Sequence, residues 1–537
     1  MLAEYNLLDE PWILASDLDG KEQKLSLKEV FHKAHVLKGI NGETETQNAA
    51  ILRLCLAVLH TIIRRYDVTG EFSVVTEKYD AIDRWGAWWN NKQFPSDVVA
   101  EYLEKWRDRF FLFSDEYPFY QDQAVGRELF EDYKKVNKKK TIGDVAGNYL
   151  SCGKLIGYLS ESGNKKRLFR AENQTSISYE EAARWLINFM NVDDKSLKRP
   201  TPKVCGSLGE IGCIFAEGKN LFETLMLNLD LENLQGTDEY PWWESDESAG
   251  ENQIKALTGL AQWYTLPVRR IFLDRQDGRV IGFKAKAGYC FDEMPLFEPM
   301  TAWRREKEKN GIMTVRPRKH NAEVFLWRNL PALLTDSDEN GKPGIISWIS
   351  ELKNENLLDE EQLLTFRSVG LEYGTMTSSL KNAFSDTVGL ATLILGEKEE
   401  RERNSVLQQV GITRRFAERY GSFAAEVFLA SGGDEGEKKS NVTAERKKGS
   451  GDFYAAIDLP FRDWLIKVGN TYRTVQEIEQ SWWRIISSVS IKLCRQMIKN
   501  LPEAAILGRK GYSAAKAYNQ YLYDTNNAER LLKGGKK

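Results

Sequence analysis

The sequence has little of what hydrolytic and NTP-driven enzymes use for their chemistry. Its 537 residues include four histidines, and neither H-x-H nor H-E-x-x-H occurs among them. The nucleophile motif G-x-S-x-G and the phosphate-binding motif G-x-x-x-x-G-K-[ST] are absent as well. Acidic pairs such as Asp193-Asp194 are more typical of a solvated surface than of a metal site. The sequence therefore predicts a protein that is not an enzyme, with a nuclease in which acidic residues hold Mg²⁺ as the enzymatic alternative.

Cysteine pairs and long apolar runs are also missing. The six cysteines form no C-x-x-C pair, which predicts reduced thiols without a disulfide framework, a metal ion or a cofactor. The first ten residues are acidic and lack the basic and apolar regions of a signal peptide. No stretch approaches the roughly 20 uninterrupted apolar residues of a membrane span. We therefore expect a cytoplasmic protein without membrane contact.

Charge of one sign is not in excess. Lys and Arg total 75 against 78 Asp and Glu, so the net charge is −3. Any contact with nucleic acid must therefore come from local basic patches. A nearly balanced net charge suits a subunit of a larger assembly. The composition, 42% hydrophobic, is that of a folded globular protein, and 537 residues are too many for one core.

The hydrophobic pattern changes near Phe366. Before it, Thr46–Arg65 has the apolar period of a helix, and Arg269–Lys286 has the pattern of two strands joined at Asp277-Gly278. Helical patterns then follow in Ser379–Leu395, Arg414–Ala430, Phe453–Lys467, Val475–Asn500 and Ser513–Asp524. They predict a bundle, with Ser431–Gly451 as a mobile interruption. We expect an α+β protein with a large mixed α/β domain over 1–368 and an all-α domain over 369–537.

The stretch Lys198–Gly212 has the composition of an exposed basic loop. Two prolines remove backbone donors and three glycines permit close backbone approaches, so neither a helix nor a central strand fits. Lys198, Arg199 and Lys203 add positive charge. Because backbone N–H groups and cations can approach phosphate together, the pattern predicts phosphate binding, with an ordinary surface loop as the alternative.

Two further basic features accompany this loop. Lys284 and Lys286 are two residues apart in the second strand of the predicted hairpin, and therefore share one face of that strand. A polar, basic stretch covers Ser160–Arg170. Basic side chains on a strand face beside basic loops predict a composite groove.

Six segments, in order along the chain, resemble one family, the large subunit of the type I-E CRISPR Cascade complex, or CasA family. They are Asn6–Ile13, Ala182–Leu186, Glu217–Leu229, Tyr264–Ile271, Leu296–Arg305 and Val369–Thr375. The resemblance implies a non-catalytic protein whose C-terminal domain is a four-helix bundle. It implies that the N-terminal domain recognises the protospacer-adjacent motif in target double-stranded DNA, mainly from the minor-groove side, while guide pairing reads most of the sequence.

The resemblance also implies a set of partners. The N-terminal domain contacts the complex near the 5′ handle of the guide RNA, and the bundle contacts the small subunits and the displaced strand. Backbone and handle-binding subunits complete the complex. The family helps to unwind the target for R-loop formation and recruits the helicase-nuclease.

Three DNA-contacting elements of the family can be carried over to this sequence. The motif-reading loop falls on Lys198–Gly212, and its candidate contacts are Lys198, Arg199, Lys203, Gly206 and Gly209. The family's denser glycine cluster is absent, so phosphate contact is expected there rather than base readout. A lysine that reads the minor groove in some members matches either Lys284 or Lys286.

The third element is a short wedge loop that inserts between base pairs beside the motif. It matches Tyr373–Thr377, and its candidate contacts are Tyr373, Gly374, Thr375 and Met376. Many members carry glutamine where this sequence has Met376, but an apolar wedge can still unstack a base step.

The guide-contacting loop is expected within Gly153–Arg170, which contains Asn164, Lys165 and Lys166. Some members carry a zinc-binding cysteine cluster that this sequence lacks. The rival to motif recognition is an assembly scaffold that contacts only guide RNA.

Overall fold

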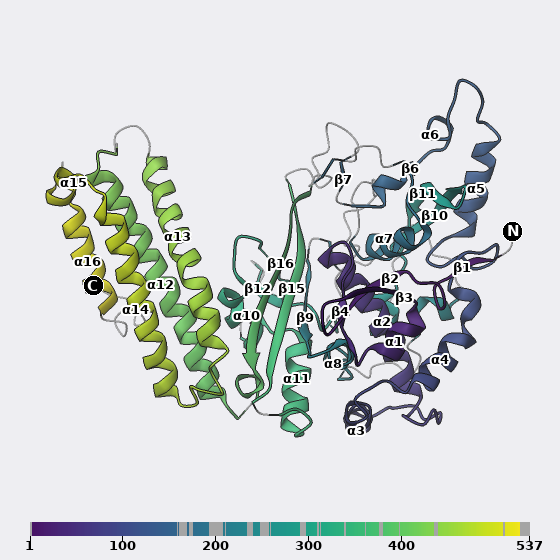
Figure 1. Cartoon of the computed structure of the whole chain (residues 1–537), viewed down its shortest axis with the longest axis horizontal. Coiled ribbons are helices and arrows are strands. Elements are labelled where there is room, and N and C mark those ends of the chain that lie inside the picture. Colours follow the sequence, from purple (N-terminus) through teal and green to yellow (C-terminus); the bar gives the residue numbers. More distant parts are fainter. Residues whose placement is uncertain are drawn as a thin grey trace. The chain divides into compact units, whose positions relative to one another are not determined.

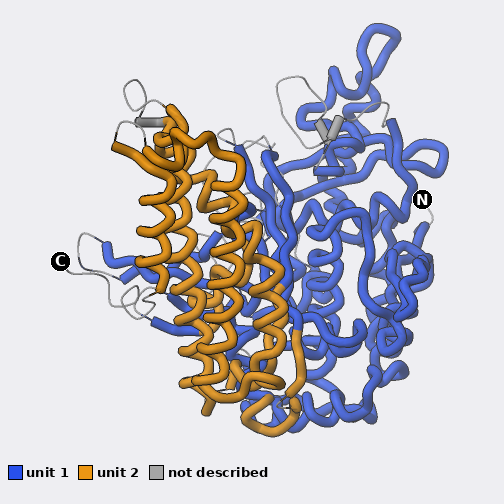
Figure 2. Tube along the Cα trace, turned by 60° about the vertical axis from the view of Figure 1, so that its left-hand side comes forward, with its two compact units in different colours: residues 1–324, 335–352, 365–387 blue, residues 325–334, 353–364, 388–537 orange. Residues whose placement is uncertain are grey.

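The computed structural model divides the chain into two compact units. It describes residues 3–157, 159–160, 169–170, 175–192, 208–209, 211–232, 240–246, 257, 259–289, 297–308, 311, 313–319, 321–337, 340–359, 361–374, 380–396, 398–433, 439–508 and 511–526. Unit 1 comprises residues 1–324, 335–352 and 365–387, and unit 2 comprises 325–334, 353–364 and 388–537 (Figure 2). The chain therefore passes between the units several times.

Helix α2 (Glu45–Arg65) forms the centre of the unit 1 core, as its apolar period predicts. The Thr44 side chain caps its first turn by accepting from the backbone N–H of Gln47. Helices α7 (Tyr179–Val192) and α9 (Leu260–Tyr264) pack against it. By length and composition α2 could cross a membrane, but 94% of its apolar window is buried inside the protein, as in the core helix of a soluble domain.

Two small antiparallel sheets flank this core. Strands β2 (Ile13–Asp17), β3 (Glu22–Leu25) and β4 (Leu37–Ile40) pair in the order β3-β2-β4. Strands β10 (Arg269–Gln276), β11 (Arg279–Ala287) and β6 (Tyr149–Ser151) pair in the order β10-β11-β6, with α5 (Gln123–Tyr133) packed on β10 and β11. Asp277 and Gly278 have φ of 52° and 73°. Positive φ at both central residues is typical of the tight turn that Asp-Gly predicts, so the hairpin is confirmed.

Several further strands and helices precede the bundle in sequence. The strands are β1 (Glu4–Asn6), β5 (Phe111–Phe113), β7 (Leu159–Ser160), β8 (Phe169–Arg170), β12 (Trp303–Lys307), β13 (Met313–Pro317) and β14 (Asn340–Gly341). The helices are α1 (Leu27–Lys33), α3 (Lys78–Asn90), α4 (Ser96–Lys105), α6 (Ile142–Val145), α8 (Leu221–Leu227), α10 (Leu330–Leu334) and α11 (Gly344–Asn354).

The helix predicted over Ser379–Leu395 is wrong. Leu380–Ala391 is strand β16, which pairs with β15 (Leu363–Tyr373), and β15 pairs in turn with β9 (Cys213–Glu217). Tertiary pairing outweighs a weak local helical pattern. The β-branched Val388 favours a strand, and Gly389 disfavours a helix. Unit 1 continues to Thr387, so the predicted boundary after residue 368 falls inside β15.

Unit 2 is an α-helical bundle. Its long helices are α12 (Glu400–Ala430), α13 (Lys439–Leu465), α14 (Val475–Lys499) and α16 (Ala514–Asn526), with the short α15 (Glu503–Leu507) before the last (Figure 1). Phe461, Trp464 and Trp482 form an aromatic cluster in its core. The α+β class with a C-terminal four-helix bundle is confirmed.

The predicted mobile interruption over Ser431–Gly451 is wrong for residues 439–451, which form the first half of α13. Residues 434–438 lie outside the described residues. Gly449 lies in a helix contact rather than in a loop: a Cβ on it would lie 2.6 Å from Ala424 Cβ and 3.2 Å from Gly421 Cα of α12. Glycine here permits two helices to approach closely.

Residues 325–334 belong to this bundle although they precede it by many residues. The Trp327 indole stacks on Phe461 at a centroid distance of 4.1 Å, and its Nε1 donates to Asp458 Oδ1 at 2.8 Å. The fully buried Trp327 therefore completes the core of unit 2.

Candidate nucleic-acid interface

The structure brings one residue of the predicted motif-reading loop beside the first residue of the predicted wedge. Leu208 N donates to Asn191 O at 2.9 Å, which holds residues 208–209 against the end of α7. A Cβ on Gly209 would lie 2.1 Å from Val192 O and 3.7 Å from Tyr373 Oη. Glycine is thus required where the loop passes between the end of α7 and the end of β15.

Of the other candidate residues in the predicted loops and the wedge, the structure describes Gly374 alone. Gly374 follows β15 and is half-buried. Nine candidates lie outside the described residues: Lys198, Arg199, Lys203, Gly206, Thr375, Met376, Asn164, Lys165 and Lys166. The described part of the interface is therefore its framework, the end of α7 with Gly209 and the end of β15 with Tyr373.

Lys284 and Lys286 both extend from β11 toward α5, which confirms that they share one face of the strand. Lys284 Nζ lies 2.6 Å from Asp132 Oδ2 and 3.5 Å from Glu128 Oε2, and its side chain is 7% exposed. Lys286 Nζ donates to Glu128 Oε1 at 2.5 Å, and its side chain is 25% exposed. Lys286 is therefore the more accessible of the two candidates.

The two α5 carboxylates that contact these lysines are held in the ionised form. The hydrogen bond from Lys286 lowers the pKa of Glu128 below its ordinary value. Hydrogen bonds from Lys135 and Lys284 lower the pKa of Asp132 in the same way. The positive charge on this face of β11 is thus largely matched by α5, and a phosphate must compete with Glu128 for Lys286.

In the part of the chain that the structure describes, no three His, Cys, Asp or Glu side chains gather as a metal site. Cys55, Cys213 and Cys494 are buried free thiols, and Cys152 is buried as well. Burial raises the pKa of Cys55 to about 12, which keeps this thiol protonated and unreactive.

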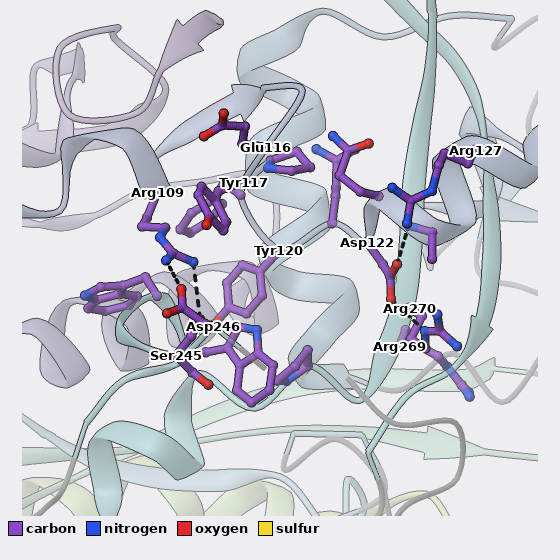
Figure 3. A pocket seen from close by; sticks show the side chains of 18 residues that line it. Arg109, Glu116, Tyr117, Tyr120, Asp122, Arg127, Ser245, Asp246, Arg269 and Arg270 are labelled. Carbon is purple, nitrogen blue, oxygen red and sulfur yellow. Dashed lines mark hydrogen bonds and ion pairs between the residues drawn. The ribbon is translucent and has the colours of Figure 1, made fainter. Parts of the chain in front are cut away.

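A pocket that the sequence did not indicate lies elsewhere in unit 1. We call it the aromatic pocket; its lining side chains come from the segments 109–127, 242–246 and 267–270, and its volume is about 260 Å³ (Figure 3). Arginines and aromatic residues dominate the lining. The aromatic density before Tyr120 was visible in the sequence, but only the fold brings the three segments together.

Comparison with known proteins identifies the family. The family described as CRISPR-associated protein Cse1 matches residues 6–493. The chain belongs to the Cse1 family. Its resemblance to the CasA family, inferred from six ordered segments, is thereby confirmed.

Individual Cse1 proteins agree with this assignment. The chain is 29% identical over 384 residues to the CRISPR-associated protein CasA/Cse1 of Thermus thermophilus, a match that covers 69% of this chain and 68% of the relative. The crystal structure of Thermobifida fusca Cse1 matches with a TM-score of 0.79 and 25% identity over 98% of this chain and 99% of that one. A chain of a CRISPR RNA-guided surveillance complex shares the fold, with a TM-score of 0.69 and 18% identity over 98% of this chain and 100% of that one.

Proposed function

We propose that this Cse1-family chain is the non-catalytic large subunit of a type I-E Cascade complex that recognises the protospacer-adjacent motif. In this role it helps to unwind the target for R-loop formation and recruits the helicase-nuclease. The observation that carries the proposal is the proximity of Gly209 to Tyr373. Motif reading and strand opening must occur at adjacent base pairs, so a motif-reading loop and a wedge have to share one framework.

The chemistry of the interface follows from its residues. Lys198, Arg199 and Lys203 supply cations and the glycines allow backbone N–H groups to approach phosphate, which positions the duplex. Met376 then inserts between base pairs, at a cost of a few kcal/mol for unstacking that other contacts offset. Guide pairing reads most of the sequence, so the protein needs to read only a short motif.

Partners follow from the same role. The bundle of unit 2 contacts the small subunits and the displaced strand, and the loop with Asn164, Lys165 and Lys166 contacts the guide-RNA handle beside the backbone and handle-binding subunits. A cytoplasmic location suits an assembly that meets invading DNA.

Binding of the guide-loaded complex to target duplexes randomised beside the target tests the proposal. With this chain present, we expect selection of a short motif and opening of the first base pairs, detected by permanganate reactivity of unpaired thymines. The complex assembled without this chain is the control. Equal binding and opening in both would contradict the proposal and favour a scaffold that contacts only guide RNA.

Replacing Glu128 with glutamine should raise the affinity for motif-bearing duplex roughly two- to fivefold. This factor corresponds to the free energy that an exposed ion pair contributes. The change removes the carboxylate that competes with phosphate for Lys286. Anisotropy titrations at increasing salt should show the gain shrinking as screening rises.

Glu131→Gln is the matched control for this prediction. Glu131 lies on the same helix, but pairs with the exposed Lys134 instead. An equal gain from both variants would indicate a general effect of charge and remove Lys286 from the interface.

A further inference from the structure

One end of the aromatic pocket is a stack of a guanidinium on a phenol ring. The Arg109 guanidinium carbon lies 3.5 Å from the centroid of the Tyr117 ring. Arg109 also donates to Ser245 O at 3.2 Å and pairs with the Asp246 carboxylate. Tyr117 is 40% exposed, so part of this stack is open to solvent. The contacts fix the guanidinium plane and leave an aromatic surface at the pocket.

The opposite end carries a second arginine–carboxylate pair. Arg270 Nε donates to Asp122 Oδ2 at 2.6 Å, and the exposed Arg127 lines the pocket beside it. Figure 3 shows Tyr120 between this end and the Arg109 end. The lining includes four arginines against three acidic residues, which leaves an excess of positive charge.

Tyr120 is held in a backbone conformation that side chains rarely adopt. Its φ is 56°, in the left-handed region. Hydrogen bonds on both sides fix it: Phe119 N donates to Phe111 O, and Asp122 N donates to Ile271 O, each at 2.8 Å. Backbone strain of this kind persists where the surrounding structure over-determines it, and it gathers at binding sites.

We propose that the aromatic pocket binds one unpaired nucleotide of a single-stranded nucleic acid. The base stacks on the aromatic rings and its phosphate meets the guanidinium groups, the combination that single-strand binding sites use. At about 260 Å³ the pocket is slightly smaller than the roughly 300–1,000 Å³ of most small-molecule sites, so it takes one base and excludes a duplex. This goes beyond the proposed function, because it assigns a single-strand contact to residues outside the motif-reading loop, the wedge, the guide-contacting loop and the bundle.

The test uses the purified full-length chain and fluorescein-labelled hexanucleotides, rU6, rA6, dT6 and dA6, followed by anisotropy. Tyr117→Ala should weaken binding roughly 5- to 100-fold, the effect of losing one stacked base. Tyr117→Phe keeps the ring and should bind within about twofold of the natural chain. Lys21→Ala removes one positive charge from the exposed connection between β2 and β3, and its effect measures how much of the binding is general electrostatics. If the chain binds the RNA oligonucleotides more tightly than the DNA oligonucleotides, the natural ligand is guide RNA. If it binds DNA more tightly, the ligand is a DNA strand. Both results support the site.

Ultraviolet cross-linking of the same oligonucleotides, read by mass spectrometry, locates the contact independently of affinity. We expect adducts on Tyr117, Tyr120 or Trp242, and their loss in the presence of excess unlabelled single strand. Unchanged affinity in Tyr117→Ala, or adducts confined to other parts of the chain, would overturn the proposal. Circular dichroism of each variant separates lost binding from lost folding.

Discussion

Replacing Gly209 with alanine should weaken motif-dependent duplex binding roughly 5- to 100-fold. The added Cβ would lie 2.1 Å from Val192 O, well inside van der Waals contact, and the obstacle is backbone that cannot rotate away. Relief requires residues 208–209 to move off the end of α7, which breaks the Leu208 N to Asn191 O hydrogen bond. Forcing extra volume into a packed site costs about 1–3 kcal/mol, which corresponds to that loss of affinity if binding needs the native loop position.

Titration of the guide-loaded complex with motif-bearing and scrambled duplexes measures this effect. Gly147→Ala is the matched control, because a Cβ on that exposed glycine meets nothing within 4 Å. Co-elution of the variant with the other subunits should be unchanged, since Gly209 is proposed to act on DNA. A variant that binds motif-bearing duplex as well as the natural chain would show that the position of residues 208–209 is irrelevant to recognition.

Replacing Arg53 with methionine should lower the free energy of unfolding of unit 1 by about 3–5 kcal/mol. Arg53 Nη2 donates to Glu298 Oε2 at 2.8 Å, and both side chains are almost completely buried, at 1% and 0% exposed. The Arg53 guanidinium also lies 4.1 Å from the centroid of the Tyr264 ring. Without it the Glu298 carboxylate remains buried with its charge unmatched, which is the costly outcome for a buried ion pair.

Urea denaturation followed by tryptophan fluorescence gives the change, and hydrogen exchange of α2 locates it in unit 1. Lys134→Met breaks the exposed pair with Glu131 and should cost at most about 0.5 kcal/mol. Combining Arg53→Met with Glu298→Gln should restore part of the loss, because no uncompensated charge then stays buried. If Arg53→Met and Lys134→Met lowered the free energy of unfolding by equally small amounts, water would have to reach Glu298, which would contradict the prediction.

Local patterns predicted the elements whose determinants lie close together in sequence. The period of Thr46–Arg65 predicted α2, and Asp277-Gly278 between two alternating runs predicted the hairpin of β10 and β11. The sequence did not predict β16, because pairing with β15, rather than its own residues, makes this segment extended. The sequence did not predict the first half of α13 either, because the local sequence around a glycine does not distinguish a helix–helix contact from a loop.

In the candidate site, too, local sequence predicts some features, whereas others depend on contacts between distant segments. That Lys284 and Lys286 share one face follows from a period of two, and the structure agrees. That Lys284 is buried against Asp132, 152 residues earlier in the chain, could not be read from either segment. The proximity of Gly209 to Tyr373 and the assembly of the aromatic pocket likewise depend on contacts between distant segments.

The repeated passage of the chain between its two units sets an order for folding during synthesis. Trp327 leaves the ribosome 131 residues before Asp458, its hydrogen-bond partner within unit 2. At about 5–20 residues per second, roughly 7–26 s pass before that partner exists. In this interval the indole has no native core to enter, while residues 335–352 and 365–387 can already join unit 1. Unit 2 must therefore be completed last, around a segment translated long before its helices.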